Sequence, residues 1–182
     1  MTKLLIDWEV IGMPYTLTEL AGDVRAILSQ SEASACSDDL CKLVSKALND
    51  PEFISTHLTD RRDGEGPREV LFEDDELGFC ICGHVYGDQA IGKPHDHGSS
   101  WALYGQAEGT TEMTDWKIVR KGDGDDPSIV EPNKTYTMNP GDAHFYGIGN
   151  VHSPKRTAPT KLVRIEGVNL DHMKRSKIVA AS

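Results

Sequence analysis

The sequence has 182 residues, of which 38% are hydrophobic and 26% charged, and this composition is typical of a globular domain with a core of ordinary size. Acidic side chains outnumber basic ones by 29 to 19, which gives a formal net charge of −10. This balance argues against nucleic acid or an anionic membrane as a partner, because binding to phosphate backbones or headgroups needs clustered Lys and Arg.

The first residues, MTKLLIDWEVIG, carry Asp7 and Glu9 and lack the continuous apolar core of a signal peptide. No apolar run approaches the roughly 18 residues that would span a bilayer. The four cysteines are therefore expected to be reduced thiols, with Cys80 and Cys82 acting as small core residues. We expect a cytoplasmic protein that does not bind a membrane.

Residues 1–57 are predicted to form a helical cover. Thr16 and Glu19 fit a capping box, and the leucines after them recur at helical spacing. Ser37 or Asp38 is suited to capping a second helix that ends near Asn49. Asp50, Pro51 and Glu52 then predict the start of a short third helix.

Residues 68–170 are predicted to form a β-barrel. Short apolar or alternating runs are separated by Gly, Asp, Asn and Pro, which is typical of an all-β sandwich or barrel. The clearest exposed loop is KGDGDDPS, residues 121–128. Because no repeat and no low-complexity tract divides the chain, residues 1–182 are expected to form one domain.

The segment KPHDHG holds two histidines one residue apart. In an extended chain His95 and His97 face the same way while Asp96 points away, so one rigid element supplies two imidazoles. Imidazole suits Fe, Zn, Cu or Ni as a ligand. The spacing alone is common, but a second glycine–histidine segment, PGDAHFYGIGNVHS, follows about 50 residues later.

These two segments resemble the two motifs of the cupin superfamily. The run Cys80-Ile-Cys82-Gly83, the HDH segment and the later Thr114-Asp115-Trp116 are similar to the thiol dioxygenase, or cysteine-dioxygenase-like, branch. The resemblance covers roughly residues 68–170 and implies a mainly β fold, a cupin-type double-stranded β-helix or jelly-roll barrel. It also implies one metal ion held by His95, His97 and a histidine of the second motif.

The resemblance favours His152 as the third ligand, since the ligand follows the strand and the turn, whereas His144 lies earlier, within the strand. No carboxylate follows the H-x-H segment before Glu108, so the expected ligand set is three neutral histidines. The resemblance implies Fe(II), with Zn or another divalent transition metal as the alternative.

Arg164 and Glu166 stand where the thiol dioxygenases carry a supporting histidine and tyrosine. An inward-facing Arg164 would bind an anionic group, and Glu166 would pair with it or act as a base. Periodicity alone favours the other alternative, in which Leu162, Arg164 and Glu166 face solvent.

Candidate substrate contacts are Trp101 and Tyr104, which follow the H-x-H segment, and Arg68, which could equally be a surface residue. Trp101 or Ala102 occupies the position of the cross-linking cysteine of that branch, so no thioether cofactor can form there. These departures argue against L-cysteine as the substrate.

The sequence thus suggests a dioxygenase that combines O₂ with a small metal-chelating molecule. One alternative is a non-redox lyase or isomerase in which the metal is a Lewis acid and Glu166, Tyr146 or Tyr104 is the base. Another is a ligand-binding barrel. Barrels of this superfamily often pair through their sheets, which would give a homodimer.

Overall fold

The computed structural model describes residues 14–123 and 125–181. The N-terminal stretch MTKLLIDWEVIG, which we expect not to be a signal peptide, lies outside the described residues. None of the helices in the described ranges has the length and apolarity that a membrane span would need.

Three helices precede the strands, as expected: α1 (Leu17–Leu28), α2 (Ser37–Leu48) and α3 (Pro51–His57). The capping box of α1 is present, because the N–H of Glu19 donates to the Thr16 hydroxyl and the N–H of Thr16 donates to the Glu19 carboxylate. The Asp50 carboxylate caps α3 by accepting the N–H groups of Glu52 and Phe53. The Cys36 side chain makes no capping bond at the start of α2, and neither Ser37 nor Asp38 is the cap.

The strands follow from residue 68 onward. They are β1 (Arg68–Glu73), β2 (Cys80–Tyr86), β3 (Ala90–Ile91), β4 (Ala102–Glu108), β5 (Thr111–Arg120), β6 (Ser128–Met138), β7 (Ala143–Tyr146), β8 (Val151–Arg156), β9 (Thr160–Glu166) and β10 (Ile178–Ala180). A single 3₁₀ turn, η1 (Leu170–His172), lies between β9 and β10.

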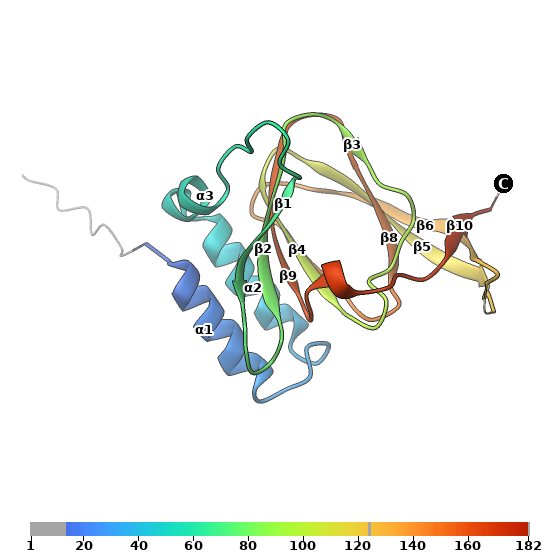
Figure 1. The fold of residues 1–182 in the computed structure, drawn as a ribbon, viewed down its shortest axis with the longest axis horizontal. Helices are drawn as coiled ribbons and strands as arrows, with labels where there is room; N and C mark the ends of the chain where they lie inside the picture. The colour runs from blue at the N-terminus through green and yellow to red at the C-terminus, as the bar shows by residue number, and fades with distance from the viewer. Residues whose placement is uncertain (1–13, 124, 182) are drawn as a thin grey trace, which may run out of the picture.

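The strands form two five-stranded sheets, with the orders β1-β2-β9-β4-β7 and β10-β6-β5-β8-β3. Without the outer strands β1 and β10, each sheet has four strands, and the chain crosses between the sheets at most connections. This is the strand order of a jelly roll. The expected cupin-type double-stranded β-helix with helices at its N-terminal end is therefore confirmed (Figure 1).

The helices cover the outer face of the β1-β2-β9-β4-β7 sheet, and α2 packs against β4 and β7 (Figure 1). Leu40, Val44, Leu103, Val163 and Ile165 are buried in this layer. The other face of the same sheet points into the barrel. Both faces are thus removed from solvent, and nearly every residue of β2, β4 and β9 is buried.

The C-terminal segment returns to the barrel and extends it past residue 170, where we expected it to end. β10 pairs in parallel with β6, next to Ser128–Val130. Between η1 and β10 the chain crosses the histidine loop, where the N–H of Ser176 donates to the buried carboxylate of Asp96 at 3.1 Å. Arg175 is thereby held beside the histidine segment.

Candidate metal site and its pocket

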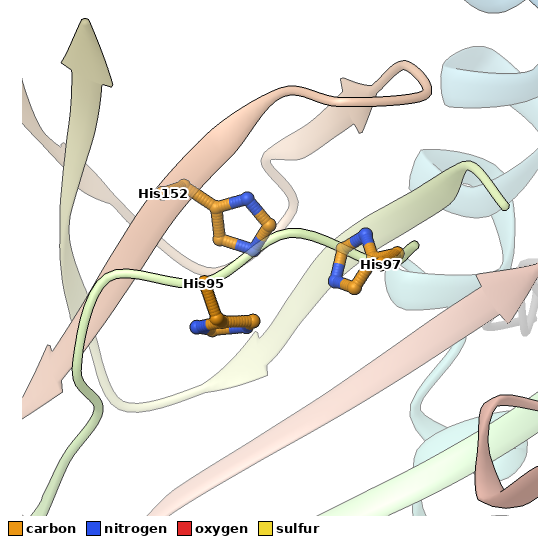
Figure 2. A group of neighbouring side chains, drawn as sticks. All are labelled: His95, His97 and His152. Carbon is orange, nitrogen blue, oxygen red and sulfur yellow. The ribbon is translucent and has the colours of Figure 1, made fainter. Parts of the chain in front are cut away.

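Three histidines come together inside the barrel. His95 and His97 lie on the loop between β3 and β4, and His152 lies on β8. His95 and His152 form an isolated antiparallel bridge, with both N–H···O distances at 3.0 Å. One ring nitrogen from each histidine lies within 4.8 Å of those of the other two. Figure 2 shows the three rings gathered around one space.

Hydrogen bonds set which ring nitrogens face that space. The Nδ1 of His95 lies 2.9 Å from the carbonyl oxygen of Lys93 and must donate to it, which leaves Nε2 with a free lone pair. The Nε2 atoms of His97 and His152 lie 3.1 and 3.4 Å from the hydroxyl of Tyr104. Within the described residues, the buried Nδ1 atoms of His97 and His152 have no hydrogen-bond partner.

Burial keeps the three imidazoles neutral. Desolvation, followed by the neighbouring cations, lowers the pKa of His95 to about 4 and that of His97 to about 3. The pKa of His152 is lowered well below its ordinary value by desolvation and by the other two histidines. Neutral imidazoles offer lone pairs to a metal near pH 7. The donor set therefore fits a divalent transition metal, and His95, His97 and His152 are the residues that could hold it.

The two histidines of the second motif lie in different places. His152 joins the group, whereas His144 on β7 packs between Tyr136 and Tyr146, at ring-centroid distances of 5.2 and 4.5 Å. His144 lines a separate cavity of about 390 Å³ beside Asp115. In the described part of the chain, the structure thus brings His152, the expected third ligand, and not His144 to the other two.

A chain of polar contacts runs from the histidines to the barrel wall. The Arg164 guanidinium donates to the Tyr104 hydroxyl at 3.1 Å and forms an ion pair with Glu166. Glu166 also accepts from Arg68 at 2.8 Å. Burial alone would raise the pKa of Glu166, but Arg164 and the hydrogen bond from Arg68 hold it below its ordinary value. Tyr104 thus links the histidines to an Arg–Glu–Arg network in which Arg164 and Glu166 are buried.

Arg164 and Glu166 are buried and face the barrel interior, which excludes the alternative that they lie on a solvent face. Val163 and Ile165 pack against the helices instead. Periodicity alone favoured the wrong alternative, because it assumes that one face of the sheet is exposed to solvent, whereas the helices and the barrel interior bury both faces. Arg68 is neither a free surface residue nor a pocket residue, because Glu166 and Asn169 bind its guanidinium.

The position expected for Trp101 needs correction. Its ring stacks on Phe145, with 5.4 Å between centroids, on the helix side of the sheet. It lines a separate cavity of about 480 Å³ near the end of α1. Because side chains alternate along a strand, Ala102 and Tyr104 face the barrel interior while Trp101 and Leu103 face the helices. Tyr104, but not Trp101, lies beside the histidines.

Cys80 and Cys82 lie on the barrel side of β2, and both are fully buried. Their sulfur atoms are 3.7 Å apart, and the Cys80 sulfur lies 3.5 Å from the Glu166 carboxylate. Hydrogen bonding to Cys82 and desolvation raise the pKa of the Cys80 thiol. A metal here would have to displace the arginines that bind Glu166. The two thiols are therefore best explained as core residues, as expected.

A pocket of about 340 Å³ opens beside the histidines and contains His95, Tyr104 and Arg164 in its wall. The rest of its lining consists of Tyr86, Ala90, Ile91, Gly92, Lys93, Pro154, Arg156 and Arg175. The sequence reasoning missed Arg156. The signal for it was present, because Arg156 lies four residues after His152 on the same strand and must share its face.

No family model and no curated protein matches the chain. Solved structures with similar folds include KdgF from Halomonas sp. (15% identity, 63% of this chain and 94% of that one, TM-score 0.45). A second is a cupin superfamily protein from Desulfitobacterium hafniense (13% identity, 61% of this chain and 84% of that one, TM-score 0.44). A third is an uncharacterised double-stranded β-helix protein from Klebsiella pneumoniae (14% identity, 66% of this chain and 85% of that one, TM-score 0.45). Sequence identities and TM-scores this low say nothing about what the chain binds, so its function has to be judged from its own residues.

Proposed function

We propose that the protein is a mononuclear non-haem metal dioxygenase that acts on a small, anionic, metal-chelating organic molecule. Fe(II) is the proposed metal, and His95, His97 and His152 are its proposed ligands. The observation that carries the proposal is the convergence of three neutral imidazoles beside a pocket, with no carboxylate in the group. Many iron oxygenases use two histidines and one carboxylate, so an all-histidine set leaves the 2+ charge of the cation uncompensated.

When bound, the metal would supply Lewis acidity and a place for O₂ next to the substrate. The residues of the chain would select the substrate by its charge and hold it by hydrogen bonds. The uncompensated charge favours an anionic substrate, since a contact ion pair is worth about 4 kcal/mol at an effective dielectric near 20. The Tyr104 hydroxyl, 3.1 Å from both His97 Nε2 and the Arg164 guanidinium, is placed to hydrogen-bond a bound substrate. The buried side chains of His97, Tyr104 and His152 would limit the access of bulk water to one side of the metal.

Anaerobic titration of the Fe(II) protein tests the proposal. Thiol acids, 2-keto acids and 1,3-dicarbonyl enolates should each change the charge-transfer absorption or the spectrum of the nitrosyl adduct. A matched His97→Ala variant should show no such change, because it lacks one ligand. If the spectrum ignored every anionic chelator while the protein converted a neutral compound, coordination of the substrate would be ruled out.

We also expect the protein to oxidise L-cysteine poorly. The resemblance aligns Arg164 and Glu166 with the supporting histidine and tyrosine of the thiol dioxygenases, and Glu166 pairs with both Arg164 and Arg68. Formation of cysteine sulfinate should be measured on protein that contains one iron per chain. Turnover equal to that of a dedicated thiol dioxygenase would contradict this expectation.

A second candidate is a non-redox lyase or isomerase in which a Zn²⁺-type ion acts as a Lewis acid. The contact of the Tyr104 hydroxyl with both Arg164 and two histidines favours it, since a general base has to lie within hydrogen-bond reach of a molecule bound there. Oxygen uptake separates the two candidates. A substrate that is converted without consumption of O₂ would support the non-redox enzyme.

A further inference from the structure

The pocket beside the histidines is cationic although the whole chain is acidic. Its lining includes Lys93, Arg156, Arg164 and Arg175, and among the described residues it contains no Asp or Glu. The formal net charge of the chain is −10, so this concentration of positive charge runs against the overall composition. Such a local reversal is typical of a surface that binds an anion.

The four cations differ in whether the protein itself neutralises them. Arg164 forms an ion pair with Glu166. Arg156 forms none within the described ranges, and its buried Nε has no hydrogen-bond partner there. The residue is only 3% exposed, and its guanidinium carbon lies 4.5 Å from the ring centre of Tyr86. Burial lowers the pKa of Arg156, although the group remains a cation.

A buried cation without an anion is energetically unfavourable, because desolvation is not offset by an ion pair. Tyr86 offsets part of this cost through its ring face. The donors of the guanidinium remain available, and its planar fork matches a carboxylate or a phosphate. An anion entering the pocket would therefore supply the partner that Arg156 lacks.

The position of Arg156 relates this anion to the histidines. Arg156 and His152 lie on the same inner face of β8, separated by four residues, or roughly 13 Å at 3.3 Å per residue. His95 and Tyr104 complete the histidine end of the pocket. A molecule that reached both ends would need a chelating group at one end and a negative charge at the other.

We propose that Arg156 is the centre of an anion-binding subsite, with Arg175 and Lys93 at its mouth. The subsite takes the carboxylate or phosphate group of a substrate whose other end approaches the histidines. This assignment deepens the proposed function and rests on it for the identity of the molecule as substrate. The binding of the anion itself does not require a metal.

Metal-depleted protein therefore gives the first test. Inorganic phosphate and succinate are titrated separately at constant ionic strength set with NaCl, and binding is followed by calorimetry. Both should bind saturably, and Arg156→Gln should weaken both affinities at least tenfold. Arg120→Gln is the matched control, since Arg120 is an exposed arginine on the same sheet, and it should bind like the unmodified protein.

Thermal stability provides a readout that a purely structural arginine would not give. In anion-free buffer, Arg156→Gln should keep or raise the melting temperature, because it removes an uncompensated buried charge. Phosphate should raise the melting temperature of the unmodified protein but not that of the variant. If Arg156→Gln does not fold, Arg156→Lys decides instead, and its phosphate affinity should fall several-fold because the bidentate fork is lost.

Three results would overturn the subsite: no binding of either anion by the unmodified protein, unchanged affinity in Arg156→Gln, or unchanged affinity in Arg156→Lys. Failure of the proposed function looks different. In that case the metal-depleted protein would still bind phosphate through Arg156, while the iron-loaded protein would consume no O₂ with any chelating anion.

Discussion

The three histidines can bind a metal because desolvation lowers the pKa of each imidazole and keeps it neutral near pH 7. His97 and His152 are buried, and the hydrogen bond from His95 to the Lys93 carbonyl fixes the tautomer of the third ring. A histidine can serve as a ligand only if the fold brings it to the same space as the others. His144 is also a partly buried histidine, but it lines another cavity.

His152→Ala should therefore remove most of the bound metal, and His144→Ala should leave the metal content close to one ion per chain. Elemental analysis of the two proteins, purified in parallel, measures this directly. Retention of metal in His152→Ala together with its loss in His144→Ala would show that the ligand set is wrong.

Glu166 is the counter-ion of the buried Arg164, and it also pairs with the half-buried Arg68. Glu166→Gln preserves the shape but leaves the buried Arg164 without a counter-ion, while Arg68 keeps its ion pair with Asp171, so the free energy of unfolding should fall by about 3–5 kcal/mol. Urea denaturation measures the loss. Glu69→Gln is the control, because Glu69 pairs with Arg61 at the surface and should change stability by less than about 1 kcal/mol. An equally small effect for Glu166→Gln would contradict the importance of the network.

For single residues, the sequence predicted correctly those side-chain positions that depend only on neighbours along the chain. His95 and His97 share a face in any extended chain, and the second motif pointed to His152. It failed where the answer depends on which face of a strand is inside. Trp101 was expected beside the histidines, but its side chain points to the helix side of the sheet. Arg156 was missed although it shares the inner face of β8 with His152.

At the scale of elements, α2 and β4 approach each other closely at Gly105. A Cβ atom built on Gly105 would lie 2.3 Å from Val44 Cγ1 and 2.8 Å from Leu48 Cδ1. The absence of a side chain at this position lets the helix lie against the sheet whose other face carries Tyr104 and Arg164. The close helix–sheet contact thus supports the strand that holds the polar network.

Gly105→Ala should lower the free energy of unfolding by about 1–3 kcal/mol, because the added methyl group forces α2 away from β4. Gly87→Ala is the control, since no atom lies within 4 Å of its added Cβ. In a Val44→Ala background the cost of Gly105→Ala should be smaller, because the nearest clashing atom is gone. A full, additive loss in the double variant would show that the contact with Val44 is not the cause.

At the scale of the whole molecule, burial of several imidazoles makes stability depend on pH. The folded pKa values of His95 and His97 are about 4 and about 3, below the ordinary value near 6.5. Between these values the unfolded chain binds protons that the folded chain does not bind. Stability is therefore greatest above about pH 6.5 and falls as the pH is lowered toward about 4.

Melting temperatures of metal-depleted protein between pH 8 and pH 4.5 check this dependence. The curve should fall on the acid side, and His97→Gln should flatten it because one depressed group is removed. Added metal should raise the melting temperature at pH 7.5, and this gain should disappear near pH 4.5, where protons compete for the imidazoles. A melting temperature that stays constant from pH 7.5 to pH 5 would contradict a loss of stability on the acid side.

The fold as a whole was more predictable than the site. Helical spacing before residue 58 and short, turn-bounded runs after residue 68 are set by burial patterns that survive in a single sequence. The strand β10 was not foreseen, since Ile178–Ala180 is short and follows a polar segment, and its pairing with β6 is decided only by the tertiary fold.

His95 and His152 meet across a bridge between distant parts of the chain, and β2 lies next to β9 for the same topological reason. Loops this long lose entropy before their ends gain any contact, so pairings of this kind form slowly. The ligand group therefore does not exist until the jelly roll has closed. A metal ion that binds the three histidines should therefore meet all of them only late in folding, and the rate at which the refolding chain captures metal should report the rate of barrel closure.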